Sequence, residues 1–246
     1  MSVNDESMTS KPTLMLLPGL ICDRAVWQQQ LAPLSAHAHC VVPDYGQLDS
    51  LAAMAQRVLQ QAPAQFMIAG HSMGGRVALE IMRTAPQRVP RLVLLDTGYQ
   101  ARSPGNVGDA EKRQRQHLLE IASVSGMRAA GREWVQGMVH ADHLQNETLI
   151  ESILAMIERH TPQTFAAQVH ALLNRPDATA VLSTITCPTL LLCGRQDAWS
   201  PLSRHEQMAT LIPGSVLEVI EHSGHMTTME QPAQVSAVMM RWLFAS

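Results

Sequence analysis

The feature that most constrains the fold of this chain is an apolar run of strand length that leads through a Gly-x-Ser-x-Gly motif into a helical segment. The run covers residues 66–69 and the motif covers residues 70–74. A serine hydroxyl is a weak nucleophile at neutral pH unless it is exposed, paired with a base and placed beside N–H donors. A sharp strand-to-helix turn lifts the serine to the tip of the bend, where neighbouring chain comes close. Ser72 is therefore the candidate nucleophile, and Gly70 and Gly74 are expected where side chains would clash. The alternative is a glycine-rich turn with an idle serine.

Composition indicates one large globular domain. The chain has 246 residues, of which 46% are hydrophobic and 16% charged, and its formal net charge is −3. This charge provides no broad basic field, so neither nucleic acid nor an anionic membrane is expected as a partner. The basic cluster at residues 111–115 is short and includes a glutamate, and we interpret it as a solvated helix face.

The N-terminus, the apolar runs and the cysteines predict a cytoplasmic protein. Residues 1–12 are expected to form a loose leader without the layout of a signal peptide, and no apolar run is long enough to span a membrane. The four cysteines show no CxxC pairing, so neither a zinc site nor a disulfide framework is expected. No metal or organic cofactor is expected.

Apolar segments of strand length alternate with segments of helical spacing. Strands are predicted at residues 13–17, 40–42, 66–70, 92–95, 189–194 and 216–220, and helices at 24–34, from 49 or 50 onward, 73–85, 202–211 and 231–244. The strands are apolar throughout, which is typical of a parallel sheet covered on both faces. The sequence therefore predicts an α/β fold.

This alternation stops between residues 101 and 184, where only helical segments are found. The clearest one covers residues 147–159 behind a possible Asn146 N-cap, and a second begins with Thr161 as N-cap and Pro162 at its first position. We expect residues 101–184 to be a helical cap over the carboxyl edge of the sheet. Residues 1–100 and 185–246 would then form the core.

The serine requires a base and an orienting acid, which should follow strands because ligands gather at the carboxyl ends of parallel strands. Asp197 follows the penultimate strand and His225 follows the last one, in the chain order Ser, Asp, His. Asp96 also follows a strand and is the alternative acid, while His222 is the alternative base.

Two further histidine features have ordinary structural interpretations. His71 flanks the serine, and we expect it to be packed inside the protein and hydrogen-bonded. His140 and His143 have a His-x-x-His spacing, but without further ligands a helix surface is favoured over a metal site.

Four segments together resemble the α/β-hydrolases with a helical cap. They are Leu17-Pro18-Gly19-Leu20, Gly70-His71-Ser72-Met73-Gly74-Gly75, Gly194-Arg195-Gln196-Asp197, and Ser223-Gly224-His225 with Glu230-Gln231-Pro232. The chain is similar to small serine esterases such as the pimeloyl-acyl-carrier-protein methyl ester esterases, and to related lactonases and carboxylesterases. The resemblance spans nearly the whole chain.

The resemblance assigns a role to each matching position. It implies that Ser72 is the nucleophile, His225 the general base and acid, and Asp197 the group that orients the imidazole. It places the oxyanion hole at the backbone N–H groups of Leu20 and Met73. Neighbouring side chains expected to line the substrate pocket are Tyr45, Trp199, Met226 and Cys22.

The chain departs from the family pattern before its first strand and at its first loop. The polar residues before Thr13 cannot supply the family's usual N-terminal hairpin, so about six sheet strands are expected instead of eight. Pro18-Gly19 stands where many relatives have His-Gly, which leaves the Leu20 donor in place.

The expected activity is hydrolysis of a small or medium carboxylic ester through an acyl-enzyme intermediate, with a small-molecule ester as the substrate. A thioesterase, a lactonase or a C–C bond hydrolase would use the same triad, and a non-catalytic small-ligand receptor would use the same scaffold. The natural substrate and the oligomeric state are left open.

Overall fold

A six-stranded parallel sheet forms the centre of the protein. The computed structural model describes residues 11–244, so the expected leader lies outside the described residues except for Lys11 and Pro12. The strand order is β2-β1-β3-β4-β5-β6, and every neighbouring pair is parallel. The strands are β1 (Thr13–Leu17), β2 (His39–Val41), β3 (Met67–His71), β4 (Leu92–Leu95), β5 (Thr189–Gly194) and β6 (Val216–Ile220). The predicted α/β class with six strands is confirmed.

The burial of the strands follows their place in the sheet. All residues of β3, β4 and β5 are buried, and so is β1 beyond its first residue, because helices cover both faces. The edge strands β2 and β6 are half-buried for most of their length. The continuous apolar runs in the sequence therefore mark the central strands.

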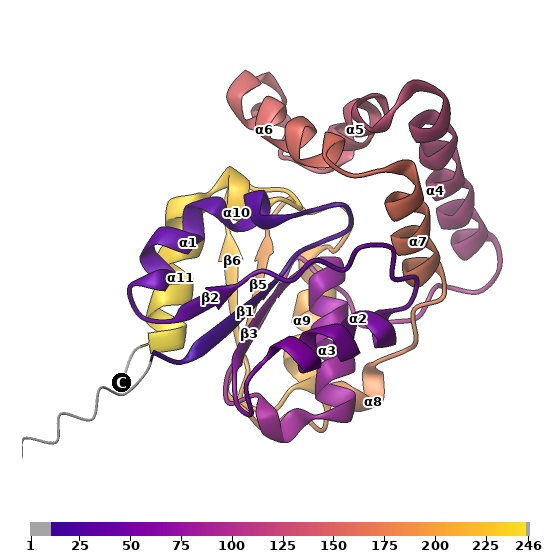
Figure 1. Cartoon of the computed structure of the whole chain (residues 1–246). Helices are drawn as coiled ribbons and strands as arrows, with labels where there is room; N and C mark the ends of the chain where they lie inside the picture. Colours follow the sequence, from indigo (N-terminus) through magenta and orange to yellow (C-terminus); the bar gives the residue numbers. More distant parts are fainter. Residues whose placement is uncertain (1–10, 245–246) are drawn as a thin grey trace, which may run out of the picture.

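Two helical layers cover the sheet (Figure 1). Helices α1 (Gln28–Ser35) and α11 (Pro232–Phe244) pack against each other on one face. On the other face α2 (Leu51–Gln61) contacts α3 (Met73–Thr84), and α8 (Thr179–Leu182) contacts both α3 and α9 (Leu202–Leu211). A short helix, α10 (Thr227–Glu230), precedes α11.

The remaining helices extend from the carboxyl edge of the sheet (Figure 1). They are α4 (Gly105–Ser125), α5 (Met127–Trp134), α6 (Glu147–Glu158) and α7 (Pro162–Leu173), with 3-10 turns at Val135–Gly137 and Ala141–Gln145. We call α4–α7 with their connections the lid. The lid helices contact one another in the pairs α4 with α5, α5 with α6 and α4 with α7.

Side chains at the predicted N-caps accept hydrogen bonds from the first turns of their helices. Ser50 caps α2, Asn146 caps α6, and Thr161 caps α7 with Pro162 in the first turn. The helix expected at residues 24–34 begins instead as a 3-10 turn, Arg24–Trp27. Asp23 accepts the Ala25 N–H there, and the α-helical geometry starts at Gln28.

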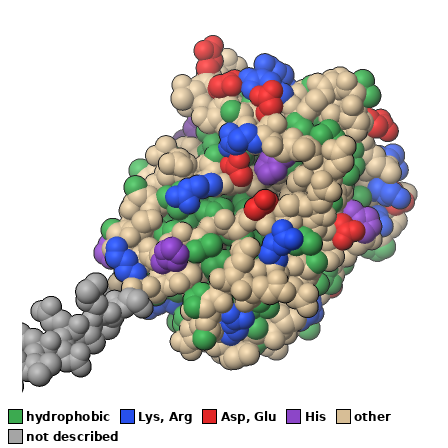
Figure 2. Space-filling model, viewed as in Figure 1, with side chains coloured by type: hydrophobic (Ala, Val, Ile, Leu, Met, Phe, Trp, Pro, Cys, Tyr) green, Lys and Arg blue, Asp and Glu red, His purple; other side chains and the backbone are tan. Residues whose placement is uncertain are grey.

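No helix within residues 11–244 combines the length and apolar character needed to cross a membrane. Acidic and basic side chains are interspersed on the face shown in Figure 2.

Candidate active site

The backbone at Ser72 bends sharply between β3 and α3. Its φ is 54° and its ψ is −115°, a conformation that non-glycine residues rarely adopt. A Cβ at Gly70 would lie 2.6 Å from the Gly74 carbonyl oxygen, and a Cβ at Gly74 would overlap the Leu17 carbonyl oxygen. Only glycine fits at both positions, so the motif permits the turn.

Hydrogen bonds from the next strand hold this bend in place. The Ser72 N–H donates to the Leu95 carbonyl over 2.9 Å, and the Thr97 hydroxyl donates to the Ser72 carbonyl over 2.6 Å. Ser72 thus lies at the carboxyl end of β3, next to β1. Strand β2 lies on one side of β1 and the later strands follow on the other side, so the sheet has its topological switch point between β1 and β3. Ligands bind at such a point in open parallel sheets.

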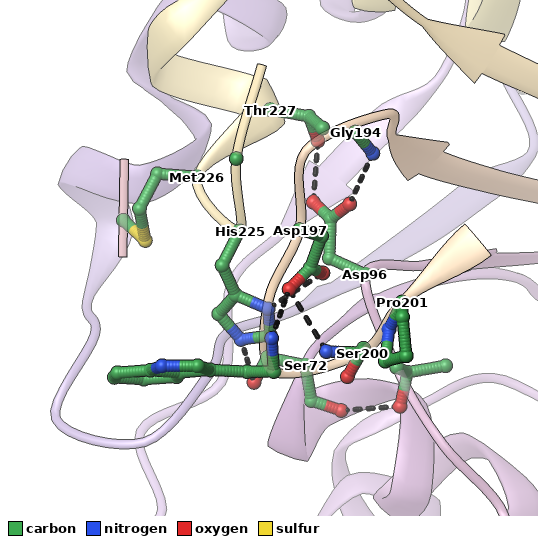
Figure 3. A network of polar contacts seen from close by, with 12 residues as sticks. Ser72, Asp96, Gly194, Asp197, Ser200, Pro201, His225, Met226 and Thr227 are labelled. Atoms are coloured by element: carbon green, nitrogen blue, oxygen red, sulfur yellow. Dashed lines mark hydrogen bonds and ion pairs between the residues drawn. The ribbon is translucent and has the colours of Figure 1, made fainter. Parts of the chain in front are cut away.

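The side chains of Asp197, His225 and Ser72 form a continuous hydrogen-bonded chain (Figure 3). His225 Nε2 lies 2.8 Å from Ser72 Oγ, and His225 Nδ1 lies 2.8 Å from Asp197 Oδ2. An ionised carboxylate only accepts, so Nδ1 carries the proton and Nε2 is free to accept from the serine hydroxyl. The three groups come from three different strand ends.

The Asp197 carboxylate is oriented by its own loop. Its Oδ1 accepts the N–H groups of Trp199 and Ser200, each over 2.8 Å. Burial by itself raises the pKa of Asp197, but His225 and these two backbone donors outweigh it and hold the pKa below its ordinary value. Asp197 is therefore ionised at neutral pH, with Oδ2 directed at the imidazole.

Asp96, the alternative acid, has different partners (Figure 3). It accepts the Gly194 N–H over 3.0 Å and the Thr227 hydroxyl over 2.5 Å. Full burial and the nearby Asp197 raise its pKa well above the ordinary range. Asp96 therefore braces the loops that carry Asp197 and His225, and it makes no hydrogen bond to the imidazole of His225 within the described chain.

His71 is packed inside the protein and hydrogen-bonded. Its Nε2 lies 2.8 Å from the His225 carbonyl oxygen, which can only accept, so Nε2 carries the proton. Burial and the neighbouring His225 lower the pKa of His71 to about 4, which keeps this ring neutral. His222, the alternative base, lies outside the hydrogen-bonded chain of Ser72.

Two backbone N–H groups remain available beside Ser72. Within residues 11–244, neither Leu20 nor Met73 donates its N–H to a protein acceptor. Met73 is the first residue of α3, where amides have no partner inside the helix. Leu20 follows β1, the strand next to β3, so both amides belong to the same corner of the sheet.

Two neighbouring cavities share part of their walls. The shared residues are Leu20, Ser72, Arg115, Trp134, Leu172, Trp199 and His225. The larger has a volume of about 310 Å³ and extends under the lid to Glu111, Arg115, Phe165 and Arg175. The smaller has about 40 Å³ and is bounded by Gly19, Cys22, Met138 and Met226.

Three of the four residues expected to line the pocket are found on these walls. Trp199 contacts both cavities, whereas Met226 and Cys22 line the smaller one. Tyr45 is buried in the core and lines neither cavity. Burial, followed by the neighbouring Asp23, raises the pKa of the Cys22 thiol to about 12, so this thiol stays protonated.

The interpretation of residues 111–115 as a solvated helix face is wrong for three of them, because Glu111, Gln114 and Arg115 line the larger cavity. Arg76, Arg175 and Arg204 line the same cavity. Arg76 could have been found from the sequence, because it lies four residues after Ser72 and so on the same side of α3. Arg175 and Arg204 carry no such local signal.

The lid is tied directly to the His225 loop. The His225 N–H donates to the Met138 carbonyl over 2.6 Å. Glu230 Oε1 accepts the N–H groups of Gly224 and Met226, while its Oε2 accepts the His140 N–H and lies 2.8 Å from His143 Nδ1. The His140 and His143 pair therefore belongs to a lid anchor, and no group of three or more metal-ligating side chains occurs among the described residues.

Aromatic rings complete the contact between lid and core. Trp134 of α5 stacks on Trp199 with ring centroids 5.2 Å apart, and Trp199 lies 5.2 Å from the His225 ring. Phe165 of α7 lies 5.9 Å from Trp134. Trp199 of the core therefore covers the imidazole, and Trp134 of the lid, which was not predicted, stacks on Trp199.

Residues 14–238 match the alpha/beta hydrolase family, and the chain belongs to it. It is an esterase-like hydrolase of this family. It is 26% identical to the pimeloyl-[acyl-carrier protein] methyl ester esterase of Nitrosomonas europaea, over 95% of this chain and 96% of that protein. It is 29% identical to a proposed carbamate hydrolase of Serratia proteamaculans, over 94% and 91% of the two chains.

Among solved structures, the chain is similar to a thermophilic esterase from Thermogutta terrifontis in a malate-bound form. The TM-score is 0.85 and the identity 30%, over 95% of this chain and 90% of the esterase.

Proposed function

We propose that this protein hydrolyses small or medium carboxylic esters, with Ser72 as nucleophile. The observation that carries the proposal is the hydrogen-bonded chain from Asp197 through His225 to Ser72, with 2.8 Å at both links. An esterase among the structural relatives, at 30% identity, supports the same class of reaction.

The first half of the reaction forms an acyl-enzyme. Ser72 Oγ attacks the ester carbonyl while its proton moves to His225 Nε2, and Asp197 stabilises the resulting imidazolium. The N–H groups of Leu20 and Met73 donate to the oxyanion, and each donor contributes on the order of 3 kcal/mol to the transition state. His225 then gives the proton to the leaving alkoxide, which departs as the alcohol.

In the second half, water releases the acid. His225 removes a proton from water as the hydroxide attacks the acyl carbonyl, and the proton returns to Ser72 Oγ when the ester bond to the enzyme breaks. The tautomer fixed by Asp197 is the one needed in both halves. Lactones and thioesters would pass through the same steps, so both belong in the substrate panel.

The experiment is hydrolysis of p-nitrophenyl esters of rising chain length by wild type and Ser72→Ala. We expect turnover by wild type and a fall of at least 10³-fold in the variant with an unchanged Tm, since removal of a triad member has effects of this order. Ser183→Ala, at an exposed serine, is the matched control and should behave as wild type. Turnover that survives Ser72→Ala would refute the mechanism. Binding of ester without turnover by wild type would indicate a receptor.

We also place the protein in the cytoplasm. The support is that Cys22, Cys40, Cys187 and Cys193 are all free thiols, as is usual in a reducing compartment.

A further inference from the structure

The larger cavity is strongly cationic although the chain as a whole is acidic. Its walls carry four guanidinium groups, those of Arg76, Arg115, Arg175 and Arg204, and a single carboxylate, that of Glu111. The formal net charge of the chain is −3. The positive charge is therefore gathered at the site and is not a property of the whole surface.

The Glu111 carboxylate accepts hydrogen bonds from two of these arginines. Arg175 binds both of its carboxylate oxygens, over 2.7 and 2.8 Å, and Arg115 Nε donates to Oε1 over 3.0 Å. These contacts join α4 to the end of α7 and hold the wall of the cavity. Neither Arg76 nor Arg204 makes a hydrogen bond or ion pair with Glu111 in the described chain.

Arg76 and Arg204 have no carboxylate within 4.0 Å in the described part of the chain. Each donates to one backbone carbonyl, Arg76 to Gln100 over 2.9 Å and Arg204 to Trp199 over 2.8 Å. A guanidinium has five N–H donors, so most donors of these two residues, which both line the cavity, have no protein acceptor in the described chain. Burial, followed by the repulsion of neighbouring arginines, lowers the pKa of Arg76 well below its usual range.

A glycine brings these two side chains together. A Cβ at Gly98 would lie 2.8 Å from Arg76 Nη2 and 2.9 Å from Arg204 Cδ. Both side chains therefore lie against the same backbone position, just beyond the end of β4. Two adjacent cationic forks with free donors match the oxygens of a carboxylate.

The shape of the two cavities indicates how such an anion would be joined to the ester. Ser72 and His225 line both the cationic cavity of about 310 Å³ and the small one of about 40 Å³, and Arg115 is the only one of the four arginines that lines both. Leu118, Phe165 and Leu172 add apolar wall to the larger cavity. It therefore suits a hydrocarbon chain with a charged end, and the small one suits a methyl or ethyl group.

We propose that the substrates are short-chain alkyl half-esters of dicarboxylic acids, with Arg76 and Arg204 binding the free carboxylate. The proposal rests on the proposed ester hydrolysis and adds the substrate class. The carboxylate stays ionised and takes no part in bond breaking. The enzyme would convert such a half-ester and water into the dicarboxylic acid and the alcohol.

The test compares three ethyl esters: monoethyl adipate, diethyl adipate and ethyl hexanoate. We expect kcat/KM for monoethyl adipate to exceed that for either neutral ester at least tenfold in low salt. The ratio of kcat/KM for monoethyl adipate to kcat/KM for ethyl hexanoate should fall at least tenfold in Arg204→Gln and in Arg76→Gln. Arg204→Lys should retain part of the preference for monoethyl adipate. Arg113→Gln removes the same charge from an exposed position on α4 and should leave the ratio as in wild type.

The proposal is overturned if wild type prefers the neutral esters, or if Arg204→Gln lowers kcat/KM for charged and neutral esters by the same factor. Calorimetric titration with adipate separates this result from failure of the ester proposal. Adipate that binds wild type but not Arg204→Gln supports the anion site even where no ester is hydrolysed. Absence of adipate binding to wild type overturns it.

Discussion

Replacement of Asp197 by asparagine tests the link between Asp197 Oδ2 and His225 Nδ1, because it changes only the atom at the Oδ2 position. Asp197 Oδ1 accepts the N–H groups of Trp199 and Ser200, so the single oxygen of an asparagine must occupy that position. Its NH₂ group then takes the place of Oδ2 and donates to His225 Nδ1. The imidazole is forced to carry its proton on Nε2, where it cannot accept the proton of Ser72.

The magnitude follows from this inverted tautomer. An equivalent change in a serine triad lowers kcat on the order of 10⁴-fold, which corresponds to about 5.4 kcal/mol at about 1.36 kcal/mol per tenfold change. The fold should persist, because asparagine has the same shape and keeps both backbone hydrogen bonds. Asp96→Asn is the matched control: its Oδ1 still accepts from Gly194, and its NH₂ can donate to the Thr227 oxygen.

The assay is steady-state hydrolysis of a p-nitrophenyl ester by the two asparagine variants, with Tm measured on the same samples. We expect Asp96→Asn to retain activity within about tenfold of wild type, since the reversed hydrogen bond costs about 1 kcal/mol. A larger loss in Asp96→Asn than in Asp197→Asn would refute the assignment of the acid.

Acid stability, backbone packing and thiol chemistry give three further expected outcomes. Burial lowers the pKa of His205 to about 4, so its neutral form contributes stability above pH 6.5 that is lost as the pH falls toward 4. Urea titrations should show that the free energy of unfolding falls between pH 7 and pH 4.5 by about 2 kcal/mol less in His205→Gln than in wild type. An equal loss would contradict the burial argument. Gly74→Ala should lower the stability by about 1–3 kcal/mol and remove most of the activity, because the new methyl group overlaps the Leu17 carbonyl. A Tm equal to that of wild type would contradict the close packing of this bend. Iodoacetamide at pH 8 should leave Cys22 unmodified in the folded protein, because its pKa is raised to about 12, and mass spectrometry of the digest checks this.

The sheet and its helices could be predicted because their signals are local. The continuous apolar runs at Leu92–Leu95 and Thr189–Gly194 form strands with these bounds, and Ser50, Asn146 and Thr161 cap the expected helices. The start of α1 could not be predicted closely. Asp23 caps a 3-10 turn there, and apolar spacing does not distinguish such a turn from the first turn of an α-helix.

The walls of the site were harder to predict than its centre. Ser72, Asp197 and His225 each follow a strand, and the parallel sheet brings such positions to one edge. Arg115 and Arg175 reach the cavity only because α4 and α7 pack over that edge, and this packing leaves no pattern in the sequence. Tyr45 follows β2, an edge strand, and its side chain turns into the core.

The bond between the Met138 carbonyl and the His225 N–H makes the roof of the pocket a support for the imidazole. A movement that lifts residue 138 breaks this bond and leaves the loop to its core contacts with Glu230 and His71, so opening the site also loosens the proposed base. A shortened chain lacking residues 105–173 would thus admit bulky esters but lack one of the supports of its base.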